Sequence, residues 1–247
     1  MKTVCFLAQK GGGGKSTMTA ITASYIAYLK GKKVCVLDAD YPQHTCYKWR
    51  SNDLAILKSE DAGETSQAKF EEQGIPPYDI IPCDINPGTP NIPWVVDVIS
   101  ALQDKPLDYV FVDLPGTLNN PNLEKIIRTI EYIFIPFTDA EEDFMSQLEM
   151  AFVLSKIKKD NSNIEHVFSY WTKFYPKMNV DLFQQLNTTL EKLPFDGILK
   201  NKIGNSRQIH FRDCRNTLFP PSSKFMKQIG SQINLGGWLK EIYSIIK

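Results

Sequence analysis

Gln9 to Thr17 reads Q-K-G-G-G-G-K-S-T, and this stretch decides the fold. Its four consecutive glycines carry no Cβ, so the backbone is free to adopt the positive φ angles that a loop needs to wrap a phosphate chain. Lys15 can then reach the β- and γ-phosphates of a nucleotide, and the Ser16 hydroxyl can ligate Mg²⁺. The predicted nucleotide-binding residues are Gly11, Gly12, Gly13, Gly14, Lys15, Ser16 and Thr17.

The residues on either side of this loop favour the same interpretation. Lys2 to Ala8 is an apolar run of strand-forming residues, and Lys15 to Lys30 has the apolar spacing of a helix that Gly31 can end. The free N–H groups at the start of such a helix face a bound anion. The order of strand, glycine loop and helix therefore predicts a phosphate-binding site and argues against a flexible glycine linker.

Length and composition are those of an ordinary globular chain. At 247 residues, of which 43% are hydrophobic, the chain can bury a sizeable core, and we expect one α/β domain over residues 1–247. The 28 basic and 28 acidic residues cancel, so any affinity for nucleic acid or membrane must come from a local patch. No stretch resembles a signal peptide or approaches the ~18 apolar residues of a membrane span, which predicts a cytoplasmic protein.

The cysteines and histidines do not have the spacing of a metal site. The five cysteines include no C-x-x-C pair, which argues against zinc or iron–sulfur ligation, and we expect buried, reduced thiols on strands. The three histidines lack metal-ligand spacing and are expected to be structural or surface residues. These residues are Cys5, Cys35, Cys46, Cys83, Cys214, His44, His166 and His210.

Two further predicted strands end in acidic residues. Lys33 to Leu37 is a β-prone run followed by D-A-D at Asp38 to Asp40, and Leu107 to Asp113 is a hydrophobic run that closes on its aspartate. Carboxylates at the carboxyl ends of parallel strands lie where α/β sheets bind ligands. Beside a phosphate-binding loop they can hold Mg²⁺ and its water. Aspartates that only cap the next helix are the alternative for the first pair.

The rest of the chain alternates between strand and helix patterns. Apolar runs predict the strands, and amphipathic spacing predicts the helices between them. We therefore expect an α/β fold with a mostly parallel central sheet and helices on both faces, as in P-loop NTPases. The further strands are expected at Tyr78–Cys83, Tyr132–Thr138 and His166–Trp171, the helices at Trp94–Leu102 and from Asp139 to about Lys159, and a polar, functionally variable surface segment at Thr45–Gly74.

Three motifs carry a resemblance to a known family. Gln9 stands where the general P-loop has glycine, and Lys10 produces the form K-G-G-x-G-K-[ST]. The pattern D-x-D-P-Q matches from Asp38 with Tyr41 inserted, and Asp113 opens D-x-P-G. Together they resemble the deviant Walker A ATPases of the ParA/MinD family. No helix-turn-helix segment precedes the first strand, so the resemblance is closest to short ParA-type partition ATPases of plasmids or conjugative elements.

The resemblance implies a role for each motif. Lys10 would cross a dimer interface to the partner's nucleotide, and Asp40 would position the attacking water. Pro136–Glu142 would contribute to the dimer face, and the nucleotide would be ATP. The implied catalytic residues are Lys10, Lys15 and Asp40, the metal-site residues are Ser16, Asp38 and Asp113, and the switch loop that senses hydrolysis is Asp113, Leu114, Pro115 and Gly116.

The segment from Lys200 to Lys227, here called the basic segment, has a strong local excess of positive charge. Asp213 is its only acidic residue. Such an imbalance in a neutral protein is the electrostatic footprint of DNA-backbone binding, and the resemblance places DNA-contacting residues of partition ATPases here. A solvated basic face is the alternative. The predicted DNA-binding residues are Lys200, Lys202, Arg207, Arg212 and Arg215.

The end of the chain, Trp238 to Lys247, predicts a helix with one apolar face. The MinD branch uses such a helix to bind membrane. The polar face here carries few cations for anionic lipid, so we expect the helix to pack on the fold instead.

The resemblance as a whole implies a switch ATPase for DNA segregation. ATP and Mg²⁺ would close a homodimer that binds DNA non-specifically and associates with the nucleoid. Slow hydrolysis, stimulated by a ParB-like centromere-binding partner, would release it. A MinD-like membrane-positioning ATPase and a small-molecule P-loop ligase or kinase are the alternatives.

Overall fold

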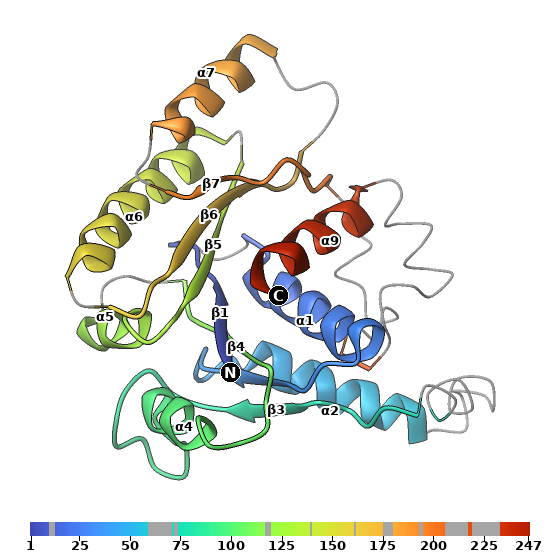
Figure 1. The fold of residues 1–247 in the computed structure, drawn as a ribbon. Coiled ribbons are helices and arrows are strands. Elements are labelled where there is room, and N and C mark those ends of the chain that lie inside the picture. The colour runs from blue at the N-terminus through green and yellow to red at the C-terminus, as the bar shows by residue number, and fades with distance from the viewer. Residues whose placement is uncertain are drawn as a thin grey trace.

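The computed structural model describes residues 1–9, 13–58, 71, 74–116, 120–138, 140–160, 162–174, 180–192, 195–205, 217–218 and 233–247. Within these residues, seven strands form one sheet in which every pairing is parallel (Figure 1). The strands are β1 (Lys2–Phe6), β2 (Val34–Asp38), β3 (Asp79–Pro82), β4 (Tyr109–Asp113), β5 (Tyr132–Phe137), β6 (His166–Trp171) and β7 (Gly197–Ile198).

The order of the strands is β3-β2-β4-β1-β5-β6-β7. Because all of them run in the same direction, the carboxyl ends of β2, β4 and β1 lie side by side at one edge of the sheet. Residues that follow these three strands in the sequence are therefore brought together. The expected α/β fold with a parallel central sheet is confirmed.

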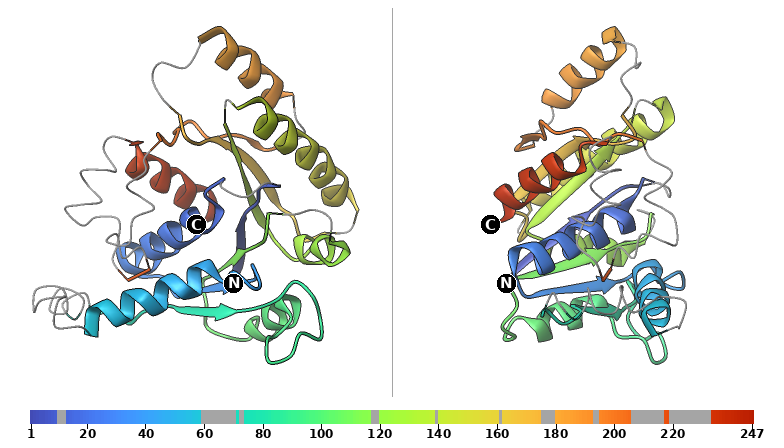
Figure 2. Two further views of the ribbon diagram at one scale, coloured as in Figure 1. Left: turned by 180° about the vertical axis from the view of Figure 1, so that it is seen from behind. Right: turned by 90° about the vertical axis from the view of Figure 1, so that its right-hand side faces the viewer.

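Helices cover both faces of the sheet (Figure 1 and Figure 2). Side chains alternate between the two faces of a strand, so Val4 and Phe6 join one apolar core, and Cys5 and Leu7 join the other. The helices of the first core are α1 (Lys15–Ser24), the π-helical turn η1 (Tyr25–Leu29), α2 (Thr45–Lys58) and α9 (Leu235–Ile246), and those of the second are α4 (Val95–Leu102), α5 (Pro121–Ile127), α6 (Glu141–Lys159) and α7 (Val180–Glu191).

The first helix differs from its expected form in one respect. The pattern over Lys15–Lys30 predicts one continuous helix, whereas its last part is the π-helical turn η1. Within this turn Tyr25 packs against Tyr243 of α9, and Tyr28 packs against Tyr78, with ring centroids 6.5 and 5.7 Å apart. Gly31 follows with a φ of 62°, as expected of a residue that ends a helix.

The expectation for Thr45–Gly74 is wrong in its first part. Helix α2 is not simply a surface element, because Cys46, Arg50 and Asp53 are buried. The two charged residues have partners elsewhere in the chain, which a local pattern does not show. The end of this segment, residues 59–70 and 72–73, lies outside the described residues.

For the four described cysteines, the expectation is correct for burial and partly wrong for location, and Cys214 lies outside the described residues. The four cysteines in the described ranges are free, buried thiols. Cys5 and Cys35 lie on strands, but Cys46 lies on α2 and Cys83 directly follows β3. Burial raises the pKa of Cys35 and of Cys83 to about 12, so both stay protonated at neutral pH.

The terminal helix packs on the fold, as expected. Trp238 is fully buried and lies against Phe6 of β1 and Tyr170 of β6, with ring centroids 5.7 and 5.3 Å away. Leu239, Ile242 and Ile246 complete its buried face. In the part of the chain that the structure describes, no helix is both long and apolar enough to cross a membrane.

Candidate functional site

The glycine loop between β1 and α1 is described from Gly13 onward, and residues 10–12 lie outside the described ranges. Gly14 is the N-cap of α1 with a φ of 78°, a left-handed conformation that favours glycine. A Cβ added to Gly13 would lie 3.3 Å from Ala8 Cβ and 3.7 Å from Pro136 Cγ. The loop therefore favours glycine at position 14 for its conformation, and a side chain at position 13 would press on Ala8, just after β1.

The first turn of α1 carries the next three predicted nucleotide-binding residues. Lys15 and Thr17 are buried, and Ser16 is half-buried. The Lys15 ammonium acts electrostatically on Asp113 at the end of β4. The backbone N–H groups of a first helical turn have no partner within the helix. A cation and a helix N-terminus at one loop suit a polyphosphate.

Asp38 and Asp113 are the last residues of β2 and β4, and the sheet register places them directly opposite each other. Both carboxyls are fully buried. The Tyr47 N–H donates to Asp38 Oδ2 at 2.9 Å, and the Cys46 thiol donates to Asp113 Oδ2 at 3.5 Å. Among the described residues, the Oδ1 atom of each aspartate has no hydrogen-bond partner. Buried oxygens are usually hydrogen-bonded, so these two are open to a further ligand.

The surroundings of these carboxyls disfavour their ionisation. Burial, followed by the Asp38 charge, raises the pKa of Asp113 to about 7, although hydrogen bonds and a nearby ammonium act in the opposite direction. Burial also raises the pKa of Asp38, and the Tyr47 N–H opposes it. A divalent cation beside the pair would favour the ionised forms that the apo protein disfavours.

Cys46 belongs to this region, although its sequence context does not single it out. Its thiol lies 3.5 Å from both the Ser16 carbonyl oxygen and Asp113 Oδ2. Burial raises the pKa of this thiol well above its ordinary value, so it stays protonated and can donate to the carboxylate. The start of α2 thus connects the glycine-loop helix with the end of β4.

His44, directly before α2, is the second residue that the sequence patterns miss. It is buried, and its Nδ1 lies 3.0 Å from the Asp38 carbonyl oxygen. Within the described chain its Nε2 has no hydrogen-bond partner. The only signal in the sequence that could have placed His44 at the site is its position four residues after Asp40, directly before the helix that begins at Thr45.

Asp40 lies at the rim of the site. It is half-buried, its carbonyl oxygen accepts the His44 N–H at 2.8 Å, and its charge acts on Asp38. The inserted Tyr41 is exposed, and its ring lies 5.6 Å from the His44 ring. The fold therefore accommodates the insertion by turning the extra side chain outward.

The residues of the predicted switch loop continue directly from Asp113. Leu114 is fully buried, and Pro115 and Gly116 are half-buried. The Asp113 carbonyl oxygen accepts the Ala39 N–H at 2.9 Å, which joins the residues after β2 and β4. Residues 117–119 lie outside the described ranges.

Of the predicted DNA-binding residues, the structure describes Lys200 and Lys202, which follow β7. Lys200 is exposed, and the Glu241 carboxylate of α9 accepts its backbone N–H at 2.8 Å. Lys202 lies 4.5 Å over the Phe174 ring, and its partial burial lowers its pKa. Arg207, Arg212 and Arg215 lie outside the described residues.

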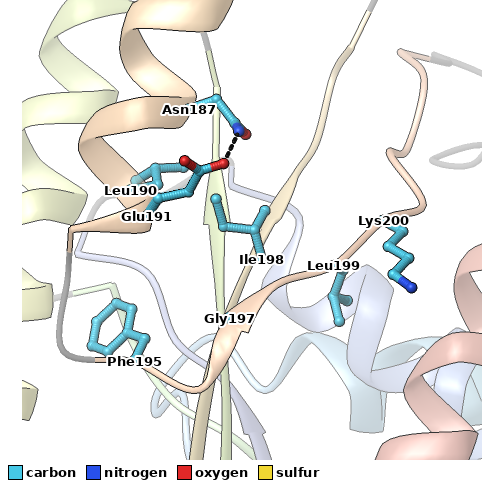
Figure 3. A pocket seen from close by; sticks show the side chains of 8 residues that line it. All are labelled: Asn187, Leu190, Glu191, Phe195, Gly197, Ile198, Leu199 and Lys200. Carbon is cyan, nitrogen blue, oxygen red and sulfur yellow. Dashed lines mark hydrogen bonds between the residues drawn. The ribbon is translucent and has the colours of Figure 1, made fainter.

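A cavity of about 350 Å³ lies beside β7, at the edge of the sheet (Figure 3). Its lining mixes apolar and polar side chains, with Asn187 donating to Glu191 at 2.9 Å. Three strands separate β7 from β4 in the sheet order, so this cavity is not part of the Asp38–Asp113 region. It is lined by Asn187, Leu190, Glu191, Phe195, Gly197, Ile198, Leu199 and Lys200.

The described residues fit a magnesium-bound nucleotide. The glycine loop, Lys15 and the start of α1 suit its phosphates. Ser16, Asp38 and Asp113 offer the oxygen ligands that Mg²⁺ prefers, and the Oδ1 atoms of the two aspartates are buried without a hydrogen-bond partner in the described chain. The fold and this site define the class of P-loop nucleotide-binding proteins.

The family is shown by sequence. The model of the CobQ/CobB/MinD/ParA nucleotide binding domain matches residues 4–236, and the chain belongs to this family. The ParA and MinD members of the family are P-loop ATPases, and the suspected resemblance is confirmed. A search of curated protein sequences finds no match.

Solved structures of this family share the fold. A plasmid partition protein of Borrelia burgdorferi B31 bound to AMPPNP is 17% identical, with a TM-score of 0.55, over 96% of this chain and 98% of its own. MinD in the MinC:MinD complex of Aquifex aeolicus is 16% identical, with a TM-score of 0.60, over 96% of both chains. The pNOB8 ParA bound to nonspecific DNA is 17% identical, with a TM-score of 0.52, over 92% of this chain and 84% of its own.

Proposed function

We propose that this chain is an ATP-dependent, dimerising switch ATPase that segregates DNA. The observation that carries the proposal is the meeting of Lys15, Ser16, Asp38 and Asp113 at the carboxyl ends of β1, β2 and β4, where two buried carboxylate oxygens lack a hydrogen-bond partner among the described residues. The family membership and the structural neighbours support it.

Each residue of the site has a proposed task in ATP hydrolysis. Lys15 and the N–H groups of the glycine loop bind the β- and γ-phosphates, and Ser16, Asp38 and Asp113 hold the magnesium site. Bound Mg²⁺ supplies charge stabilisation to the phosphoryl oxygens. Asp40, at the rim, orients the attacking water. Leu114 to Gly116 directly continue from Asp113, so they are placed to respond when the γ-phosphate leaves.

The proposed switch works through a homodimer. Lys10 of each subunit contacts the phosphates bound by its partner, so ATP closes the dimer and hydrolysis opens it. The useful output is the difference in partner affinity between the ATP and ADP states, which does not require fast turnover. A ParB-like centromere-binding protein is the proposed activator.

DNA is the proposed ligand of the ATP state. The local excess of basic residues between Lys200 and Lys227 supports this assignment, and the partition ATPase pNOB8 ParA has been solved on nonspecific DNA. Contacts to phosphates are indifferent to base sequence, so affinity would fall with rising salt.

A MinD-like membrane function is the alternative, because MinD is among the structural neighbours. The packing of α9 argues against it. The apolar residues Trp238, Leu239, Ile242 and Ile246 are buried in the core and so do not form an exposed face for lipid.

Sedimentation with linear duplex DNA tests the proposal. Protein in ATP or in ADP is centrifuged with DNA of unrelated sequences at low and moderate salt, with Lys15→Ala as the nucleotide-binding control. We expect co-sedimentation only with ATP, and less of it at moderate salt. A protein that dimerises in ATP but ignores DNA at low salt would contradict the DNA function, and binding to anionic vesicles would then favour the MinD-like alternative.

A paired substitution tests the basic segment. Arg207→Ala combined with Arg212→Ala is expected to lower DNA affinity and to make the slope of log affinity against log salt shallower by about 2. ATP turnover without DNA should stay unchanged. The matched control replaces the exposed Lys105 and Lys240, which lie outside the segment. Equal salt slopes for both pairs would remove these arginines from the DNA contact.

A further inference from the structure

Two charged residues of α2 are buried and have no task in the site described above. Arg50 is 7% exposed and Asp53 is 5% exposed. Charged groups are rarely buried unless strongly partnered, because losing their hydration is costly. Both side chains bond to Thr217, which lies inside the basic segment, two positions after Arg215.

Every polar atom of Thr217 is bonded to the first part of the chain. Its N–H and its hydroxyl donate to Asp53 Oδ2, at 3.2 and 2.5 Å. Its hydroxyl oxygen accepts from Arg50 Nε at 3.1 Å. Its carbonyl oxygen accepts from Arg50 Nη2 at 2.8 Å and from the Tyr28 hydroxyl at 3.0 Å. We call this cluster of Tyr28, Arg50, Asp53 and Thr217 the Thr217 anchor.

On its α2 side the anchor has further contacts, which Arg50 makes with Tyr78. The Arg50 guanidinium lies 4.4 Å over the Tyr78 ring and also donates to the Tyr78 carbonyl oxygen. The guanidinium is planar and its donors point in fixed directions, so these contacts determine where its Nε and Nη2 atoms point. Thr217 and Leu218, both fully buried, are thereby held in one place on the fold.

A hydroxyl is the group that this arrangement requires. The Thr217 oxygen donates to a carboxylate and accepts from a guanidinium at the same time, which serine can also do and valine cannot. Loss of the hydroxyl would leave buried charged groups with fewer partners. The contact therefore depends on the chemistry of the side chain as well as on its volume.

One face of α2 connects the anchor with the nucleotide site. Cys46, Arg50 and Asp53 follow one another at spacings of four and three residues, which places them on the same side of the helix, and all three are buried. Cys46 contacts the Ser16 carbonyl oxygen and the Asp113 carboxylate. A single buried stripe thus contacts Ser16 and Asp113 at one end and Thr217 at the other.

We propose that Arg50 and Asp53 are positioning residues that fix Thr217, which follows the predicted DNA-binding residue Arg215 by two positions in the sequence, to the helix that contacts the nucleotide site. The DNA readout of this inference rests on the proposed function. The attachment itself does not, because hydrogen exchange measures it without DNA.

The test compares Thr217→Val with Thr217→Ser in the full chain, with Ser51→Ala on the exposed side of α2 as a matched control. Circular dichroism first establishes that each variant is folded. Amide exchange of peptides that contain Thr217 and Leu218 is then followed with and without Mg²⁺ and ATPγS. DNA affinity and the affinity for a fluorescent ATP analogue are measured on the same samples.

We expect exchange at Thr217 and Leu218 to accelerate by about tenfold or more in Thr217→Val, as for the loss of a hydrogen bond to a charged group, and to stay near wild type in Thr217→Ser. DNA affinity should fall by a similar factor in Thr217→Val and in Arg50→Lys, while affinity for the ATP analogue changes less than about twofold. Addition of the nucleotide should change the exchange in the wild type and not in Thr217→Val.

Three results would overturn the inference. One is unchanged exchange and DNA affinity in Thr217→Val. Another is an equal loss of DNA and nucleotide affinity that Thr217→Ser does not restore, which would indicate a general structural role. The third is wild-type exchange that does not respond to nucleotide. A wild type that never binds DNA, but shows the expected exchange pattern, would contradict the proposed function and leave the attachment supported.

Discussion

Asp196 lies at the amino end of β7 and Asp113 at the carboxyl end of β4, in the same parallel sheet. Their surroundings are opposite in kind. Asp196, just before β7, accepts the Val167 N–H at 2.7 Å and the Lys158 ammonium at 3.0 Å, with His166 Nδ1 at 3.3 Å. Although partial burial acts the other way, these groups lower the pKa of Asp196. Asp113 is fully buried, one of its oxygens lacks a partner in the described chain, and burial raises its pKa to about 7.

We propose that this difference separates a carboxylate that stabilises the fold, Asp196, from one that is held for a ligand, Asp113. A structural aspartate has its partners within the protein, so ionisation favours the folded state. The pair of Asp38 and Asp113 costs stability when ionised, and a cation is the partner that would offset this cost. Such an unfavourable arrangement is expected at functional sites. Four substitutions test this contrast.

Lys15→Ala should have the largest effect. Removal of the ammonium from the glycine loop takes away the charge that binds the phosphates, and we expect ATP affinity to fall at least about 100-fold. Binding of a fluorescent ATP analogue measures the loss. Lys48→Ala, an exposed lysine on α2, is the matched control and should bind normally. Equal affinity of Lys15→Ala and wild type would place the nucleotide elsewhere.

Asp113→Asn should stabilise the nucleotide-free protein. Because the folded pKa is raised from 3.8 to about 7, the folded state holds its proton while the unfolded state releases it, and stability is lost as pH rises between these values. Above pH 7, the ionised Asp113 lowers the free energy of unfolding by on the order of 4 kcal/mol. The neutral amide of the asparagine variant avoids this loss. Urea unfolding measures the difference in free energy of unfolding between Asp113→Asn and wild type. This difference should grow from pH 4 to about pH 7 and then level off. A variant that is less stable at pH 8 would contradict the assignment.

Asp196→Asn should act in the opposite direction. The folded pKa is lowered, so the stability this carboxylate provides is present above its unfolded pKa and is lost as pH falls through the folded value. Its replacement should cost about 1–2 kcal/mol at pH 7, because a charge-assisted hydrogen bond to a backbone N–H is weakened in a partly exposed place. The exposed Asp104 is the control position. No change in urea unfolding would show that the Asp196 contacts are not stabilising.

Lys32→Gln should have the smallest effect. The Lys32 ammonium lies 3.8 Å from Asp108 Oδ1, and the two side chains are 39% and 41% exposed. Solvent screening limits such a pair to a contribution below about 0.5 kcal/mol. A larger change in the free energy of unfolding would contradict the expectation that exposed charges contribute less to stability than buried ones.

The sequence predicts the part of the site that depends on local patterns. Glycines mark the loop, and Asp38 and Asp113 follow apolar runs, so their meeting at one edge follows from a parallel sheet. The positions of most strands and of α4, α6 and α9 are also correct for this reason. The two-residue strand β7 carries too little pattern to be recognised.

What the sequence does not show depends on tertiary contacts. Cys46 and His44 reach the site only because α2 folds back over the strand ends. Arg50 and Asp53 look like the solvated face of a polar helix, and their partner Thr217 is more than 160 positions away. No local pattern links residues that far apart in the chain, so the Thr217 anchor can be recognised only in the structure.

The most direct test of the account measures unfolding of wild type and Asp113→Asn at pH 8, each with and without Mg²⁺ and ATPγS. Without ligand, the variant should be the more stable protein. At saturating ligand the wild type should gain about 4 kcal/mol by binding at a thousandfold excess over Kd, which cancels the advantage of the variant, because the variant lacks the carboxylate and gains less. Equal gains in both proteins, or a wild type that is already the more stable one without ligand, would contradict the claim that Asp113 is held for magnesium and nucleotide.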